Sequence, residues 1–178
     1  MNRNGNEELE IKLEKTRALL AEHDLDGLLL RRTANFSWLT GGACSWVNVA
    51  EETGLAALLI TAKERYLITN NIEAPRLRQE AGLEEMGWQF VVSLWYDPGD
   101  PIAPLVHGLR LATDGLYPGT DLSPQLSRLR MDLLPPEQER LRVLAKDCAQ
   151  AMDAAIRQVH PGLNEFAIAG CLAKETQE

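Results

Sequence analysis

Residues 135–159 carry the pattern that most restricts the fold of this chain, because their apolar residues recur at helical spacing over a long distance. The run follows Leu133-Leu134-Pro135-Pro136, where proline disfavours helix in the residue before it and is itself accommodated in a first helical turn. Its apolar positions are Leu141, Leu144, Cys148, Met152, Ala155 and Val159. At ~1.5 Å per residue the run predicts roughly 35 Å of helix with one long apolar face, which other elements must cover.

The residues after this run predict the beginning of a second domain. The segment from His160 to Glu165 ends the long helix, and a further helix is expected from Phe166. Two helices do not make a domain, so we expect a complete first domain, 1–134, and the first helices of a second domain, 135–178. The alternative is a stand-alone module of 178 residues, which requires the apolar face to fold back or to pair with a partner.

The beginning of the first domain predicts a helix followed by a buried strand. Four positions at helical spacing predict an amphipathic helix over about 7–23, with Glu and Lys residues on its opposite face: Leu9, Leu13, Thr16 and Leu20. The run Leu28-Leu29-Leu30 is short and continuously apolar, which is typical of a strand covered on both faces. A helix followed by a buried strand is the usual opening of an α/β layer structure.

The rest of the first domain continues this alternation. Two apolar runs, 55–61 and 66–69, flank a short polar link and predict an antiparallel β-hairpin. The further expected elements are a helix over 71–81, a strand over 88–96, a helix over 102–109, a strand over 111–113 and a helix over 124–130. The sequence therefore predicts an α/β fold, a mixed β-sheet flanked by helices, followed by a long C-terminal helix.

Composition excludes several classes of protein. A formal net charge of -8 disfavours a nucleic-acid-binding surface, which draws affinity from clustered Lys and Arg. No apolar run approaches the ~20 residues that a membrane span needs, and the N-terminal residues contain no apolar signal segment. The cysteines, Cys44, Cys148 and Cys171, lack the spacing of a zinc or redox site. We therefore expect a cytoplasmic protein that binds neither nucleic acid nor membrane.

Residues that could carry chemistry are sparse. The histidines, His23, His107 and His160, are not spaced as metal ligands. Asp97 and Asp100 lie in a proline- and glycine-rich run that is typical of a turn. No serine has the G-x-S-x-G context of a hydrolase nucleophile. From the residues alone we assign no catalytic residue and no metal ligand to this chain.

The segment 41–53 is the candidate binding element of the first domain. It is long for a connection inside a compact domain, and long loops of this kind are often functional. It carries Trp46 and Asn48, and an aromatic side chain on such a loop can form the wall of a binding site. The alternative is that Trp46 and Val47 simply fold onto the sheet.

Short motifs in both predicted domains occur in an informative order. The first domain contains Asp26-Gly27-Leu28-Leu29-Leu30, then Asn35-Phe36-Ser37-Trp38-Leu39-Thr40-Gly41, then the hairpin around 63–66. This order resembles the N-terminal domain of the creatinase, prolidase and Xaa-Pro aminopeptidase family. The second contains 139–142, the long helix and 161–169, which resemble the opening of that family's pita-bread catalytic domain.

The resemblance implies the non-catalytic, N-terminal portion of a metal-dependent Xaa-Pro aminopeptidase or dipeptidase. In the family this domain supports dimer formation and helps to shape the substrate entrance, so Trp46 and Asn48 become candidates for that entrance in a homodimer acting on peptides. The pita-bread domain binds two divalent metal ions, commonly manganese, cobalt or zinc, through two Asp, one His and two Glu. All these ligands are expected beyond residue 178, so the chain alone is expected to be inactive and to hold no cofactor.

Two other functions remain open at this point. A creatinase-like enzyme would hydrolyse a C–N bond of a small amidino compound, and the N-terminal half does not distinguish it from a peptidase. A non-catalytic peptide-binding or assembly module is the rival from another class, because some pita-bread relatives have lost their metal ligands. Metal ligands in the downstream sequence would separate the binding module from the metal-dependent peptidase.

Overall fold

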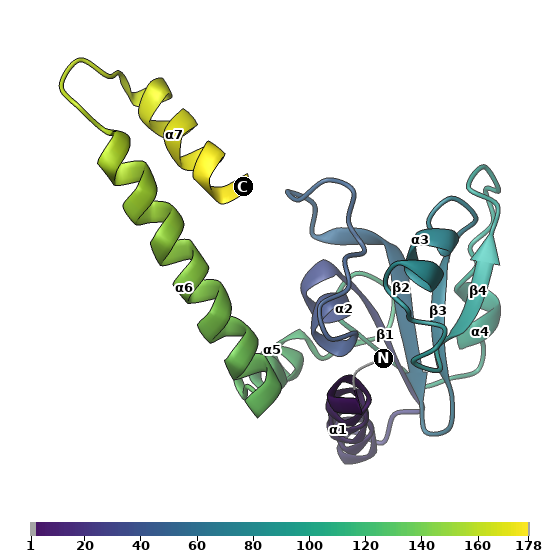
Figure 1. Ribbon diagram of the computed structural model, residues 1–178. Helices are drawn as coiled ribbons and strands as arrows, with labels where there is room; N and C mark the ends of the chain where they lie inside the picture. The colour runs from purple at the N-terminus through teal and green to yellow at the C-terminus, as the bar shows by residue number, and fades with distance from the viewer. Residues whose placement is uncertain (1–2, 178) are drawn as a thin grey trace. The chain divides into compact units, whose positions relative to one another are not determined.

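A computed structural model describes residues 3–177, which divide into two compact units between Asp132 and Leu133 (Figure 1). The first unit contains the β-sheet and five helices, and the second contains two helices.

A six-stranded mixed sheet forms the centre of the first unit, with the strand order β4-β3-β2-β1-β5-β6. The pairs β1–β2 and β2–β3 are antiparallel, while β3–β4, β1–β5 and β5–β6 are parallel. The strands are β1 (Gly27–Arg32), β2 (Thr53–Thr61), β3 (Arg65–Asn70), β4 (Gln89–Ser93), β5 (Leu111–Thr113) and β6 (Thr120–Asp121). The predicted mixed sheet and the predicted hairpin are both confirmed.

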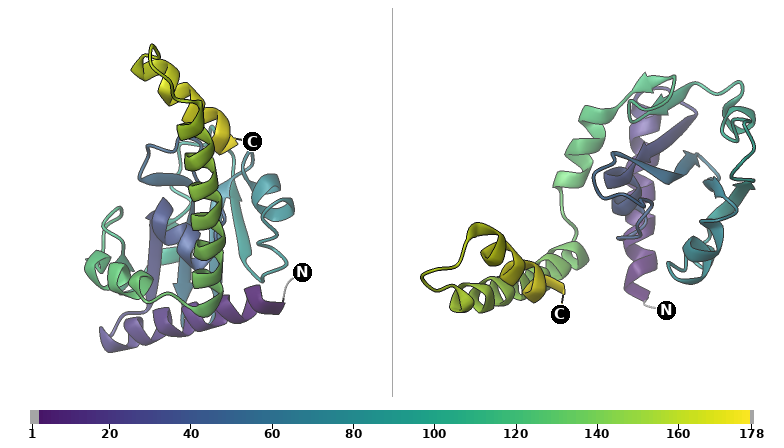
Figure 2. Two further views of the ribbon diagram at one scale, coloured as in Figure 1. Left: turned by 60° about the vertical axis from the view of Figure 1, so that its left-hand side comes forward. Right: turned by 90° about the horizontal axis from the view of Figure 1, so that it is seen from above.

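Helices cover the two faces of this sheet unequally. The first unit contains α1 (Arg3–Glu22), α2 (Thr33–Leu39), α3 (Ala74–Gln79), α4 (Ala103–Val106) and α5 (Ser123–Met131). Helices α1, α2, α3 and α5 contribute to one hydrophobic core, while α4 packs with the core on the other face. The two further views show α3 and α4 on opposite sides of the sheet (Figure 2).

Alternate residues of each strand supply the two cores, as the period of a strand requires. Leu28 and Leu30 of β1 pack with the helices of the larger core, and Leu29 packs on the other face. Leu58 of β2 belongs to the larger core and Leu59 to the smaller. The continuous Leu28-Leu29-Leu30 run therefore marks a strand that is buried on both faces, as the sequence predicted.

Helix α1 confirms one sequence expectation and corrects another. Its predicted apolar positions, Leu9, Leu13, Thr16 and Leu20, are all buried. However, Glu8 and Lys12 are also buried, although the sequence placed Glu and Lys residues on the exposed face. The Lys12 Nζ donates to Glu8 Oε1 at 2.6 Å and to the Trp38 carbonyl oxygen at 2.6 Å. Burial of both charges is tolerated because each is paired and hydrogen-bonded.

Three elements are much shorter than the sequence predicted: α3, β4 and α4. Helix α3 begins only at Ala74, because the Asn70 side-chain oxygen accepts hydrogen bonds from the backbone of Ile72 and Glu73 and forms a turn there. Strand β4 ends at Ser93, since the Asp97 amide donates to the Leu94 carbonyl oxygen and turns the chain. Helix α4 contains four residues instead of the eight expected.

Two elements were not predicted. Helix α2 is only seven residues long and has no side-chain cap, so its local sequence signal is weak. It is stabilised by tertiary packing, because Phe36 and Leu39 are fully buried. Strand β6 has two residues, both exposed, and therefore carries no hydrophobic pattern.

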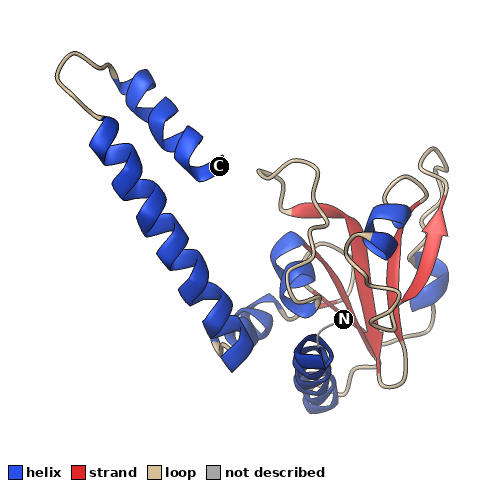
Figure 3. Cartoon of the chain, viewed as in Figure 1, coloured by secondary structure: helices blue, strands red, loops and turns tan. Residues whose placement is uncertain are grey.

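The second unit is a helical hairpin of α6 (Pro135–Gln158) and α7 (Glu165–Gln177) (Figure 3). The Leu134 amide donates to Glu137 Oε2 at 2.9 Å, which caps the start of α6 beside its two prolines. Helix α7 packs on the C-terminal half of α6 and buries Ala155. Between them lies an apolar groove of about 300 Å³, lined by residues that include Met152, Ile156, Ile168 and Leu172. Much of the long apolar face of α6 is open to solvent: Leu141, Leu144, Met152 and Val159 are all exposed.

A surface ion pair joins the turn before β1 to the turn before β5. Arg110 donates from Nε to Asp26 Oδ2 at 3.0 Å and from Nη2 to Asp26 Oδ1 at 2.9 Å. The Asp26 amide also donates to the Arg110 carbonyl oxygen. Hydrogen bonds from the Arg110 side chain and backbone lower the pKa of Asp26 from 3.8 to about 2.

This pKa shift predicts a pH-dependent contribution to stability. Because the folded-state pKa is depressed, the contribution is present above about pH 3.8 and is lost as the pH falls through about 2. The melting temperature of Asp26→Asn should therefore lie below that of the parent at pH 5 to about 7, and the difference should shrink between about pH 4 and 2. Glu51→Gln controls for loss of an exposed negative charge. A difference that is independent of pH would contradict the assignment.

Candidate functional site

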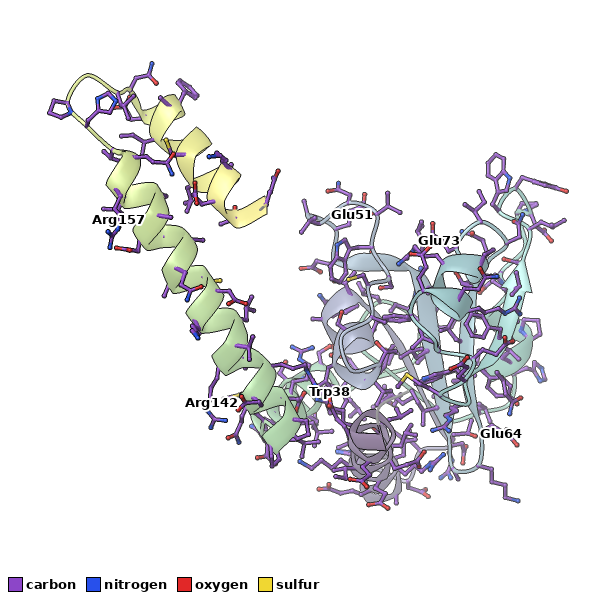
Figure 4. All side chains as sticks on the ribbon, in the orientation of Figure 1. Trp38, Glu51, Glu64, Glu73, Arg142 and Arg157 are labelled. Atoms are coloured by element: carbon purple, nitrogen blue, oxygen red, sulfur yellow. The ribbon has the colours of Figure 1, made fainter. Side chains whose placement is uncertain are left out.

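The ends of four strands come together at one end of the sheet. Strands β1, β3, β4 and β5 all run in one direction, and β2 runs in the opposite direction between β1 and β3. The carboxyl ends of these four strands therefore lie at the same end of the sheet as the start of β2. Ligand sites of α/β sheets commonly lie at this end. In Figure 4 the labelled Glu51 and Glu73 lie at this end, and the labelled Glu64 lies at the opposite end.

A buried carboxylate, Asp114, organises the polar groups where β1 and β5 end. Its side chain is fully buried, and Oδ2 accepts hydrogen bonds from the Arg31 amide at 2.9 Å and the Arg32 amide at 2.7 Å. The same oxygen accepts a hydrogen bond from Asn35 Nδ2 at 2.9 Å. Asn35 in turn accepts a hydrogen bond from Arg130. Asp114 therefore fixes α2 against the end of the central strand.

The loop between α2 and β2 is anchored at both of its ends. The Gly42 amide donates to the Ser37 carbonyl oxygen at 2.8 Å, and the Ser37 hydroxyl donates to the Ala43 carbonyl oxygen at 2.8 Å. On the other side, the Leu55 amide donates to the Ser45 carbonyl oxygen at 2.7 Å. Ser45 is buried against Gly54 so closely that a Cβ on Gly54 would lie 2.5 Å from the Ser45 Cβ. These contacts fix the base of the loop while leaving its tip free.

The tip of this loop contains both residues that the sequence singled out. Trp46 is half-buried and Asn48 is exposed. The Asn48 side-chain oxygen accepts a hydrogen bond from the Ala50 amide at 3.1 Å, so this residue shapes the turn of the tip. Beside them, Val47 is 72% exposed and Val49 is 83% exposed. The tip therefore presents an apolar surface to solvent.

A separate cleft of about 470 Å³ opens at the same end of the sheet. Its floor includes Ala57 and Ile68, and its walls include Arg31, Trp95 and Tyr117. Trp46 and Asn48 do not line it. The sequence did not predict this cleft, because its residues come from β1, β2, β3, the end of β4, the segment 94–102 and the turn after β5, which only the tertiary fold brings together.

Asp100 and Tyr117 form a polar pair in this cleft. The Tyr117 hydroxyl donates to Asp100 Oδ2 at 2.7 Å, and this hydrogen bond raises the pKa of Tyr117. Desolvation acts to raise the pKa of Asp100, but hydrogen bonds from Tyr117 and from the Ile102 and Ala103 backbone together lower it. Asp97 and Asp100 also accept backbone hydrogen bonds from Gly99 and Ile102, which agrees with their predicted role as turn formers.

A metal site does not fit the residues described here. Between residues 3 and 177 there is no group of three or more His, Cys, Asp or Glu side chains placed to hold a metal ion. The two divalent ions that the family resemblance implies therefore have no ligand set in this part of the chain. The three cysteines are free thiols. None of the described helices is both long and apolar enough to cross a membrane.

Several solved structures share this fold. The Xaa-Pro dipeptidase from Bacillus anthracis is 19% identical with a TM-score of 0.70, and the match covers 95% of this chain and 49% of that chain. The X-Pro aminopeptidase from Thermotoga maritima MSB8 is 18% identical with a TM-score of 0.66, covering 93% and 48%. The dipeptidase PepE from Mycobacterium ulcerans is 21% identical with a TM-score of 0.61, covering 96% and 50%. The chain thus spans about half the length of these proteins.

A comparison with curated proteins finds no match. The family assignment comes instead from a comparison of the sequence with protein-family models. Residues 12–131, which include α2, the loop after it and the whole sheet, match the family model described as Creatinase/Prolidase N-terminal domain. The chain belongs to the creatinase/prolidase N-terminal domain family.

Proposed function

We propose that this chain is the non-catalytic, N-terminal portion of a metal-dependent Xaa-Pro aminopeptidase or dipeptidase. The observation that carries the proposal is the extent of the structural match, which covers 95% of this chain but 49% of an Xaa-Pro dipeptidase. A match of this extent includes residues of the second unit, because the first unit ends at Asp132. In this proposal the first unit is the N-terminal domain, and the α6–α7 hairpin opens a pita-bread domain whose metal ligands lie beyond residue 178.

The native protein that contains this chain provides the test. Isolated from its source with an antibody to the first unit, it should release the amino acid before proline from Xaa-Pro peptides, and a chelator should abolish that activity. The 178-residue chain should be inactive in the same assay. Hydrolysis of a small amidino compound would support the creatinase-like alternative instead. Peptide binding without hydrolysis would support the binding module.

We also propose that the loop of residues 41–52 contributes to the substrate entrance. Its base is fixed by hydrogen bonds on both sides, and its tip presents half-buried Trp46 beside exposed Val47 and Val49. A loop with a fixed base, a half-buried tryptophan and exposed valines at its tip suits contact with a peptide side chain, because such contacts need apolar area without a large ordering cost. Asn48 would act by shaping the turn that presents Trp46.

Kinetics on the native-length protein test this role. Trp46→Ala should raise KM by about threefold to tenfold for a series of Xaa-Pro peptides while changing kcat less, because a side chain at the entrance contributes mainly to ground-state binding. Trp46→Phe should recover part of the lost affinity, and an unchanged melting temperature would show that the fold is intact. Parental kinetics for Trp46→Ala on every peptide would remove the loop from the entrance.

A homodimer completes the proposal. The resemblance implies a dimer, and the first unit has a stretch of exposed apolar residues that are close together in the sequence: Val92, Leu94, Trp95 and Tyr96. Contiguous exposed apolar surface commonly marks a protein–protein interface.

A further inference from the structure

Strand β4 leaves one edge of the sheet open. It is the terminal strand of the sheet, and among residues 3–177 it pairs with β3 alone, in a regular register from Tyr66↔Gln89 to Asn70↔Ser93 (Figure 1). The opposite edge is formed by β6, which has only two residues. Proteins commonly protect an edge with lysine, proline, a bulge or a very short strand. Strand β6 is protected by its shortness, whereas β4 has none of these features.

The backbone of β4 has polar groups that face away from the sheet. The Ser93 carbonyl oxygen accepts a hydrogen bond from the Asn71 amide, so the polar groups of Ser93 face β3. Backbone polar groups alternate in direction along a strand, so those of Phe90 and Val92 face outward. Within residues 3–177, the hydrogen bonds outside the sheet ladders include none to the backbone of Phe90 or Val92. These groups are therefore available to another strand.

The residues around this edge are apolar and exposed. Val92 is 38% exposed, Leu94 is 47% exposed, Trp95 is 63% exposed and Tyr96 is 66% exposed. The Trp95 and Tyr96 rings pack edge to face with centroids 5.7 Å apart, so they form one aromatic surface. An open strand edge continuous with such a surface offers both backbone pairing and apolar burial to a partner.

The sequence of this edge is compatible with a copy of itself. An antiparallel pair with its two-fold axis at Val91 places Phe90 of one copy opposite Val92 of the other. In that register the outward N–H and C=O groups of both residues are paired, and aromatic and β-branched side chains meet across the junction. Residues 88–96 contain no charged side chain, so two chains of net charge -8 bring no like charges together along it.

We propose that β4 pairs antiparallel with β4 of a second copy, joining two six-stranded sheets into one continuous sheet. The inference rests on the proposed homodimer and assigns its surface. The exposed aromatic pair of each copy lies directly after the paired strand and extends the contact.

The association of the full 178-residue chain tests this surface. Sedimentation velocity over about 5 to 200 µM should give a dimer for the parent, because mass action populates a dimer as concentration rises. Val92→Lys should weaken dimerisation at least about tenfold, since a lysine at an open edge opposes pairing. Ile72→Lys places the same charge on another exposed apolar residue and should leave dimerisation unchanged. A monomeric parent at every concentration, or a Val92→Lys variant that dimerises like the parent, would overturn the proposal.

A cross-link identifies the register. In a background with Cys44, Cys148 and Cys171 replaced by serine, Val91→Cys should form an intermolecular disulfide under mild oxidation, because directly opposed Cβ atoms lie roughly 4.5–5.5 Å apart. Ser93→Cys should not, because two-fold copies of that residue lie ~13 Å apart along the strands. A dimeric Val91→Cys variant that does not cross-link would place the dimer interface elsewhere. That outcome would refute this surface while leaving the proposed peptidase function to the activity assay.

Discussion

Asp114→Ala should destabilise the first unit by about 3 kcal/mol or more, because a buried carboxylate that accepts several hydrogen bonds is removed from its donors. Asp114 is fully buried and accepts from the Arg31 and Arg32 amides and from the Asn35 side chain. All three donors would be left without this acceptor at a fully buried position. Such losses exceed the effect of most single substitutions.

The substitution series at this position separates geometry from charge. Asp114→Asn keeps one acceptor oxygen of the same size and should lose roughly half as much stability as Asp114→Ala, because hydrogen bonds to a charged acceptor are about twice as strong as neutral ones. Glu51→Ala removes an exposed carboxylate and should change stability by less than about 0.5 kcal/mol.

Urea unfolding followed by tryptophan fluorescence measures this series directly. All four tryptophans of the chain, Trp38, Trp46, Trp88 and Trp95, lie in the first unit, so the signal reports on that unit alone. If Asp114→Ala unfolds within about 1 kcal/mol of the parent, the carboxylate does not hold β1, β5 and α2 together.

Gly54→Ala should cost about 2–3 kcal/mol, because the site has no space for a methyl group. A Cβ at residue 54 would lie 2.5 Å from the Ser45 Cβ and 2.7 Å from the Ser45 carbonyl oxygen, and it would also collide with the Ser45 hydroxyl. The carbonyl is held in place by the Leu55 amide, so it cannot move aside without breaking that hydrogen bond. The base of the loop must therefore shift.

Two further variants show whether the collision is the cause. Ser45→Gly removes two of the three obstructing atoms and should recover part of the loss when it is combined with Gly54→Ala, giving a favourable coupling energy in a double-mutant cycle. Gly170→Ala is the matched control, because a Cβ there meets nothing within 4 Å and the residue lies within helix α7. It should be neutral or slightly stabilising. A Gly54→Ala variant as stable as the parent would contradict the packing described at Ser45.

The parts of the fold that the sequence predicted are those with a periodic hydrophobic signal. Leu9, Leu13 and Leu20 of α1 repeat at helical spacing, and Leu28-Leu29-Leu30 has a continuous apolar run bounded by charges. Each pattern arises from the burial of the element itself, so it is visible without knowledge of the partner. The α/β fold and the hairpin followed from these local signals.

The parts that were missed depend on partners distant in sequence. Lys12 is buried because the Trp38 carbonyl oxygen accepts its hydrogen bond from 26 residues away, and no local pattern contains that information. Helix α2 is too short to have a strong periodic signal. Asp114 reads locally as the start of an Asp-Gly turn, and its role becomes visible only when Arg31 and Asn35 are brought to it by the sheet.

The length of the candidate loop and its tryptophan mark it in the sequence. The residues that surround the loop in the structure have no such local signal. The glycine at residue 54 reads as an ordinary strand residue until the buried Ser45 is placed against it. The cleft with Arg31, Trp95 and Tyr117 joins segments separated by up to 86 positions, so no motif of contiguous residues marks it. The sequence identifies a loop that can contact a ligand. The surface around that loop is visible only in the structure, because distant segments form it.

The strand order has a consequence for the chain during its synthesis. Strand β1 lies at the centre of the finished sheet, yet its neighbour β5 follows much later, since the flanking residues Asp26 and Arg110 are 84 positions apart. At roughly 5–20 residues per second, a nascent chain needs about 4 to 17 seconds to make that stretch. During this interval β1 can pair with β2 but not with β5, and the leucine-rich edge of β1 stays open. An open strand edge can pair with another chain, so the interval before β5 is made is the one in which this sheet is most exposed to aggregation.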